Sequence, residues 1–85
     1  MSEIKRVIGM FYPFDMYSQL ILLDDNNNIT DTKKVKSAEF QKEVIQILET
    51  DPDIKVELYG IQDLLEGLFK DYKDKYKITI KKGEQ

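Results

Sequence analysis

The sequence contains no cysteine and no histidine. Without cysteine, the chain has no disulfide framework and no thiolate ligand for a metal ion. Without histidine, it lacks the commonest general base and the commonest zinc ligand. We therefore expect no catalytic activity, no metal site and no cofactor. The side chains that remain are better suited to binding other macromolecules than to transforming a substrate.

Long apolar runs are also missing. The longest run, at 20–23, is far shorter than the roughly 20 residues that a membrane helix needs. The first six residues lack the apolar stretch of a signal peptide. We therefore expect a cytoplasmic protein with no membrane association. Its 85 residues are 41% apolar and 34% charged, which is typical of one small folded domain over 1–85, with a flexible tail at 83–85.

The clearest structural signal is the stretch 53–60, in which apolar and polar residues alternate. This period of two predicts a strand with one buried face. Apolar residues at Phe40, Val44, Ile47 and Leu48 instead recur with the period of a helix. Strands are predicted at 4–12, 19–23, 29–35 (a weak edge strand), 53–60 and 77–81, and helices at 37–50, with Ser37 as N-cap, and at 61–76.

This order predicts a small α/β or α+β domain with a mixed sheet of four or five strands and both helices packed on it. Each helix connects two strands, so the last strands should be parallel neighbours through right-handed crossovers. The strands at 4–12 and 19–23 look apolar on both faces, yet two helices can cover only one face of the sheet. A partner, or a second copy in a homodimer, could cover the other face.

The element order resembles the minimal core of the ribonuclease-H-like fold. That family carries a catalytic aspartate in its first strand, where this chain has Ile8, Gly9, Met10 and Phe11. The resemblance implies that Glu57 could stand for the family's second acid. One acid cannot hold the two metal ions of such chemistry, so the implied site is degenerate. A metal-dependent nuclease is therefore the weakest of three functional hypotheses, and Glu57 fits better on a solvated sheet face.

The segment 11–17 is the least ordinary feature of the sequence. Aromatic residues and methionine gather around Pro13 in an expected surface loop, and such residues often anchor protein interfaces. They either fold back to close the core or form a binding surface. The second interpretation gives our main hypothesis, a non-catalytic inhibitor, adaptor or regulatory subunit that binds a protein partner. Its binding residues would be Phe11, Tyr12, Phe14, Met16 and Tyr17.

The C-terminal stretch supplies the alternative. Residues 70–85 contain six lysines and three acidic residues, and tyrosines lie between the lysines. Basic groups interleaved with aromatic rings can follow a nucleic-acid backbone and stack on its bases. A solvated helix face that carries charges is the structural alternative to that interpretation. A nucleic-acid-binding domain would use Lys70, Lys73, Lys77, Lys81 and Lys82.

One acidic segment, 24–28, suggests calcium at first sight. Asp24, Asn26 and Asn28 match the first ligand positions of an EF-hand loop. Val35 stands at the twelfth position, however, where a bidentate glutamate is required. The segment is better explained as a polar hairpin turn, because Asp and Asn side chains hydrogen-bond their own backbone.

Overall fold

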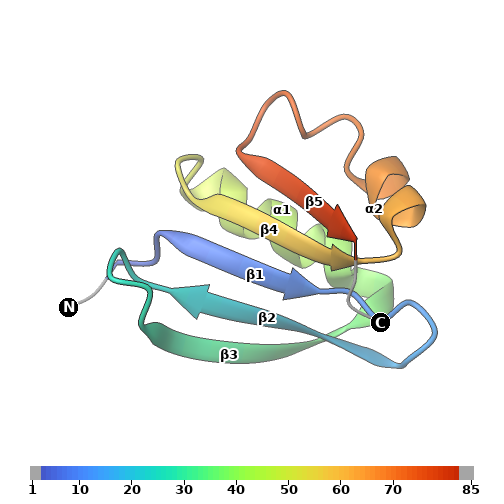
Figure 1. The fold of residues 1–85 in the computed structure, drawn as a ribbon, viewed down its shortest axis with the longest axis horizontal. Coiled ribbons are helices and arrows are strands. Elements are labelled where there is room, and N and C mark those ends of the chain that lie inside the picture. The colour runs from blue at the N-terminus through green and yellow to red at the C-terminus, as the bar shows by residue number, and fades with distance from the viewer. Residues whose placement is uncertain (1–2, 83–85) are drawn as a thin grey trace.

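The computed structural model describes residues 3–82, whose five strands form one mixed sheet in the order β3-β2-β1-β4-β5 (Figure 1). The antiparallel pairs are β1–β2 and β2–β3, whereas β1–β4 and β4–β5 are parallel. The elements are β1 (Arg6–Met10), β2 (Tyr17–Leu23), β3 (Ile29–Lys36), α1 (Phe40–Thr50), β4 (Lys55–Gly60), α2 (Gln62–Leu68) and β5 (Ile78–Lys82). The predicted mixed sheet, its edge strand and its parallel last strands are confirmed. The tail predicted at 83–85 lies outside the described residues.

The core lies between the helices and one face of the sheet. Leu20 and Leu58 point into it from the strands, and Phe40 points into it from α1. The Phe40 ring stacks on Phe11 with centroids 4.8 Å apart and meets the edge of Phe69 at 6.3 Å. These contacts join β1, α1 and the end of α2 in one apolar cluster, as the helical period around Phe40 predicted.

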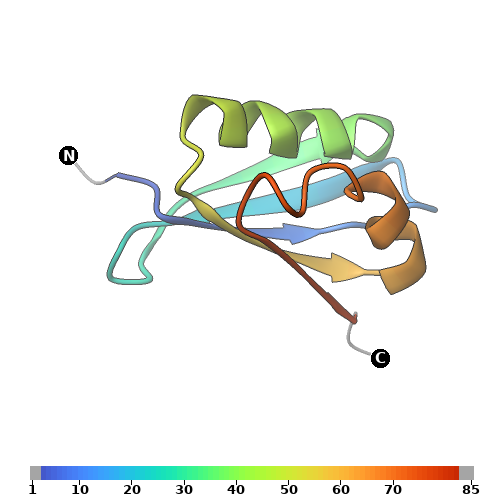
Figure 2. The same cartoon turned by 90° about the horizontal axis from the view of Figure 1, so that it is seen from above.

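The opposite face of the sheet is not covered by any element within residues 3–82, and Figure 2 shows α1 along only one side. We call this side the open face. Ile8, Met10 and Ile21 lie on it and are only partly buried. Within the described part of one chain, the second face of the first two strands is therefore uncovered, and any cover would have to come from a partner or a second copy. Apolar composition alone does not distinguish a covered strand from one that shows apolar side chains to solvent.

The start of α1 also differs from the prediction. A short 3-10 turn, Ser37–Glu39, precedes the helix, and the Ser37 side chain does not cap it. The Ser37 hydroxyl instead donates to the carbonyl oxygen of Tyr12 at 2.9 Å. Ser37 therefore ties two distant parts of the chain together, and the helix begins without a side-chain N-cap.

Helix α2 ends at Leu68, well before the predicted end at Tyr76. Successive turns follow, in which the N–H groups of Tyr72 and Lys73 donate to the Phe69 carbonyl at 3.0 and 3.1 Å. These turns still bring Tyr76 into the core. The apolar spacing therefore predicted the burial of Tyr76 correctly, although the chain there is not helical. Among the helices within residues 3–82, none is long and apolar enough to cross a membrane.

Candidate binding surface

The loop between β1 and β2, residues 11–16, holds the most exposed apolar side chains that the structure describes. Phe14 is 91% exposed and Met16 is 73% exposed. Pro13 helps to end the strand because it has no N–H group for the ladder. The chain then turns, and the N–H of Asp15 donates to the Tyr12 carbonyl at 3.1 Å. We call the segment 11–17 the aromatic loop.

A ring of hydrogen bonds fixes the base of the aromatic loop. The Tyr12 N–H donates to the Ser18 hydroxyl at 2.9 Å, and the Ser37 hydroxyl donates to the Tyr12 carbonyl at 2.9 Å. The two hydroxyls are 2.7 Å apart, so Ser18 can donate to Ser37 and close the ring. The Ser37 N–H also donates to the Met16 carbonyl at 2.9 Å. These bonds hold the loop against the junction of β3 and α1.

The five residues predicted to bind a partner divide into two groups. Phe11 is only 6% exposed and stacks on Phe40, so it belongs to the core and cannot act as a surface anchor. Its inward position follows from strand alternation, because Val7 and Gly9 face the same side. The other four, Tyr12, Phe14, Met16 and Tyr17, are exposed at the surface.

Beside the loop, the surface is hollowed. Met16, Lys36 and Ala38 line this hollow, and the buried Phe11 also lines it. The lining of the hollow combines the apolar Phe11 and Met16 with the charged Lys36, so it offers a partner side chain both apolar and polar contacts.

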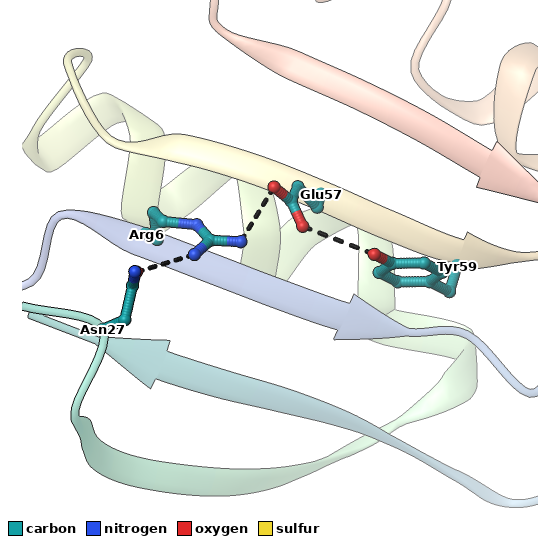
Figure 3. Close-up of polar contacts among 4 residues, drawn as sticks. All are labelled: Arg6, Asn27, Glu57 and Tyr59. Atoms are coloured by element: carbon teal, nitrogen blue, oxygen red, sulfur yellow. Dashed lines mark hydrogen bonds and ion pairs between the residues drawn. The ribbon is translucent and has the colours of Figure 1, made fainter.

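The open face carries a second group of candidate functional residues, and Glu57 is one of them. One Glu57 carboxylate oxygen accepts from Arg6 at 2.9 Å, and the other accepts from the Tyr59 hydroxyl at 3.4 Å. Arg6 also donates to the Asn27 side chain at 2.7 Å. Figure 3 shows Arg6, Glu57 and Tyr59 over β1 and β4 on the open face, with Asn27 reaching toward Arg6 from the turn between β2 and β3. Glu57 is therefore engaged in a cross-strand network, in keeping with the solvated sheet face predicted for it.

Lysines from strands far apart in the sequence share this face. Register places Lys36 beside Tyr17 and Lys81 beside Tyr59. The Lys34 ammonium lies 4.6 Å from the centroid of the Tyr17 ring, and the Lys81 ammonium lies 5.9 Å from that of Tyr59. Sequence reasoning missed Lys34, Lys36 and Lys55 because it considered charge runs. Their alternation with the buried residues Val35 and Val56 was the signal that could have found them.

The lysines predicted to bind nucleic acid do not form one surface. Lys73 is bonded to Glu66 at 2.8 Å, and Lys77 lies 3.8 Å from Asp53. Lys70 is exposed in the turns after α2, whereas Lys81 lies on the open face. Lys82 belongs to β5, but its side chain falls outside the description. The predicted stretch is therefore divided between an ion-paired turn region and the sheet.

The acidic turn at 24–28 is held by its own backbone. The Asp24 carboxylate accepts from the N–H groups of Asn26 and Asn28, both at 2.9 Å. The hydrogen bond from Asn28, followed by that from Asn26, lowers the pKa of Asp24. Its role is that of a turn residue, as predicted. Across residues 3–82, no three acidic side chains converge in a way that could hold a metal ion.

No protein-family model matches this sequence, and comparisons with curated proteins and with solved structures found no significant match. The resemblance to the ribonuclease-H-like core therefore remains one of element order. The exposed surface features of the fold are therefore the basis for a functional proposal.

Proposed function

We propose that this protein is a non-catalytic protein-binding domain that acts as an inhibitor, adaptor or regulatory subunit, with the aromatic loop as its anchor. The observation that carries this proposal is the exposure of Phe14 and Met16, at 91% and 73%, on a loop whose base is fixed. Aromatic side chains and methionine are enriched at protein interfaces. We propose a cytoplasmic location, which is compatible with a chain that contains no cysteine.

The fixed base of the loop supports binding for an energetic reason. Association costs conformational entropy wherever a loop must become ordered. The ring formed by Tyr12, Ser18 and Ser37 already orders the backbone from which Phe14 projects. More of the free energy from burying Phe14 and Met16 is then available for affinity.

The test compares two double variants of the full chain used as bait in an extract of its host. F14A/M16A removes the proposed anchor, whereas I29A/L64A removes two exposed apolar side chains elsewhere. We expect one protein to co-purify in stoichiometric amount with the wild type and with I29A/L64A, and to be lost with F14A/M16A. Circular dichroism and thermal unfolding of F14A/M16A should match the wild type.

Self-association is the second form of this proposal. In that case, light scattering should give twice the 10.0 kDa mass of the chain, and F14A/M16A should return it to the monomer. A partner that F14A/M16A retains, or a wild-type chain that is monomeric and captures no stoichiometric protein, would contradict the proposal.

A further inference from the structure

The open face has a charge opposite to that of the whole chain. The chain carries a net charge of −3. Strand alternation and register direct Arg6, Lys34, Lys36, Lys55 and Lys81 onto the open face. Within the described strands, Glu57 is the only acidic residue on that face, and Arg6 neutralises it. Four lysines remain there without an ion pair among residues 3–82, so the face is strongly basic.

Most acidic residues lie elsewhere. Glu43 and Glu49 are on α1, and Asp63 and Glu66 are on α2, on the other side of the sheet. The fold thus keeps most acidic residues away from the open face, although lysines occur on both sides of the sheet. A basic face on an acidic protein attracts a polyanion locally although the molecule as a whole does not.

Aromatic rings accompany the lysines. Tyr17 and Tyr59 each have a lysine ammonium beside the ring, at 4.6 and 5.9 Å. The Tyr12 hydroxyl reaches the Met10 sulfur at 3.5 Å, which places a third ring at the edge of the same face. Met10 and Gln19 lie in the same row of the sheet as Tyr59, and the partly exposed side chains of Ile8 and Ile21 lie in the next row, beside Glu57.

We propose that the open face binds single-stranded nucleic acid. Bases stack on aromatic and apolar side chains whatever their sequence, while lysines neutralise the phosphates between them. The uncovered face of the sheet offers its rings to unpaired bases, which a duplex keeps stacked inside. An acidic protein partner is a poorer candidate ligand for the open face, because lysine is depleted at protein–protein interfaces. The two proposals share Tyr12 and Tyr17 at the edge of the open face, but Lys34, Lys55, Lys81 and Tyr59 lie outside the aromatic loop, so each proposal can be tested separately.

The test measures binding of the full chain to fluorescein-labelled dT20 by anisotropy at low salt. The variant K34Q/K55Q/K81Q should bind about tenfold more weakly or worse. It should also reduce the slope of log Kobs against log salt by about 0.7 for each phosphate that a lysine no longer neutralises. The matched control K70Q/K73Q/K77Q removes the same charge from the C-terminal stretch and should retain affinity within about threefold.

Tyr59 tests the stacking. Tyr59→Leu should lose about tenfold in affinity, whereas Tyr59→Phe should retain it, because the ring and not the hydroxyl contacts the base. If the triple variant does not fold, as judged by circular dichroism, the single variants K34Q and K81Q replace it. F14A/M16A should bind dT20 like the wild type, so the failure of one proposal is distinguishable from the failure of the other.

Several results would overturn the proposal. They are no binding of dT20 at low salt, a larger loss of affinity in K70Q/K73Q/K77Q than in K34Q/K55Q/K81Q, and tighter binding of a 20-base-pair duplex. Equal or tighter binding of polyglutamate would assign the face to an acidic protein instead.

Discussion

At Gly9 the stability of the fold depends on the absence of a side chain. A Cβ at Gly9 would lie 2.7 Å from Leu58 Cδ2 and 2.8 Å from Phe40 Cζ. Both neighbours are fully buried, so neither can withdraw without disturbing the core. We expect Gly9→Ala to lower the free energy of unfolding by about 1–3 kcal/mol. Urea denaturation of the two proteins measures the difference.

Gly67 provides the matched control for that substitution. It lies in α2, and a Cβ there would meet nothing within 4 Å. Gly67→Ala should therefore raise the free energy of unfolding by about 0.5–1 kcal/mol, because alanine loses less backbone entropy in a helix. A neutral or stabilising Gly9→Ala would show that the core can yield at that point. A glycine within a strand is typical of either a bulge or a close approach, and at Gly9 only the packing distinguishes the two.

Between elements, the hydroxyl ring at the base of the aromatic loop joins β1 and β2 to the junction of β3 and α1. Ser18→Ala would leave the part-buried Tyr12 N–H without its acceptor, which should lower the free energy of unfolding by about 1 kcal/mol. Ser37→Ala breaks the same ring at its next member. We expect the double variant S18A/S37A to lose less stability than the two single losses combined, by at least about 0.5 kcal/mol.

A double-mutant cycle, measured by urea denaturation, tests this coupling. Losses that add to within about 0.3 kcal/mol would show that the two hydroxyls act independently. Ser37 also shows what sequence reasoning can mistake at this scale. A serine just before an apolar helical stripe is a common N-cap, yet here its hydroxyl is used by a residue 25 positions away. Local pattern contains no information about such a partner.

Across the whole molecule, most of the fold was predictable, because it follows from local periods and from the rules that connect elements. The alternation at Lys55–Gly60 predicted the interior strand β4, and the stripe through Phe40 predicted the first helix. The binding surfaces were less predictable. Phe11 and Phe14 look alike in the sequence, but alternation along β1 buries one, and the loop exposes the other. The basic face needed the register of five strands, which no single stretch specifies.

The one-sided core leads to a last prediction, which compares adjacent residues of β2. Leu20 faces the helices and is fully buried, whereas Ile21 lies on the open face and is partly exposed. Leu20→Ala should therefore lower the free energy of unfolding by about 2–5 kcal/mol, which is a large share of the total for so small a domain. Ile21→Ala should cost only about 1 kcal/mol, mostly through strand propensity. Urea denaturation at several protein concentrations measures both losses.

The same pair also tests whether the open face is free in solution. If Ile21→Ala lowers the free energy of unfolding as much as Leu20→Ala does, then Ile21 is covered when the chain is folded. Within a pure sample, the only available cover is a second copy, so the cost would then rise with protein concentration. That outcome would contradict an open face that is accessible to nucleic acid. Equal costs at every concentration, with a monomeric mass by light scattering, would instead contradict the one-sided core itself.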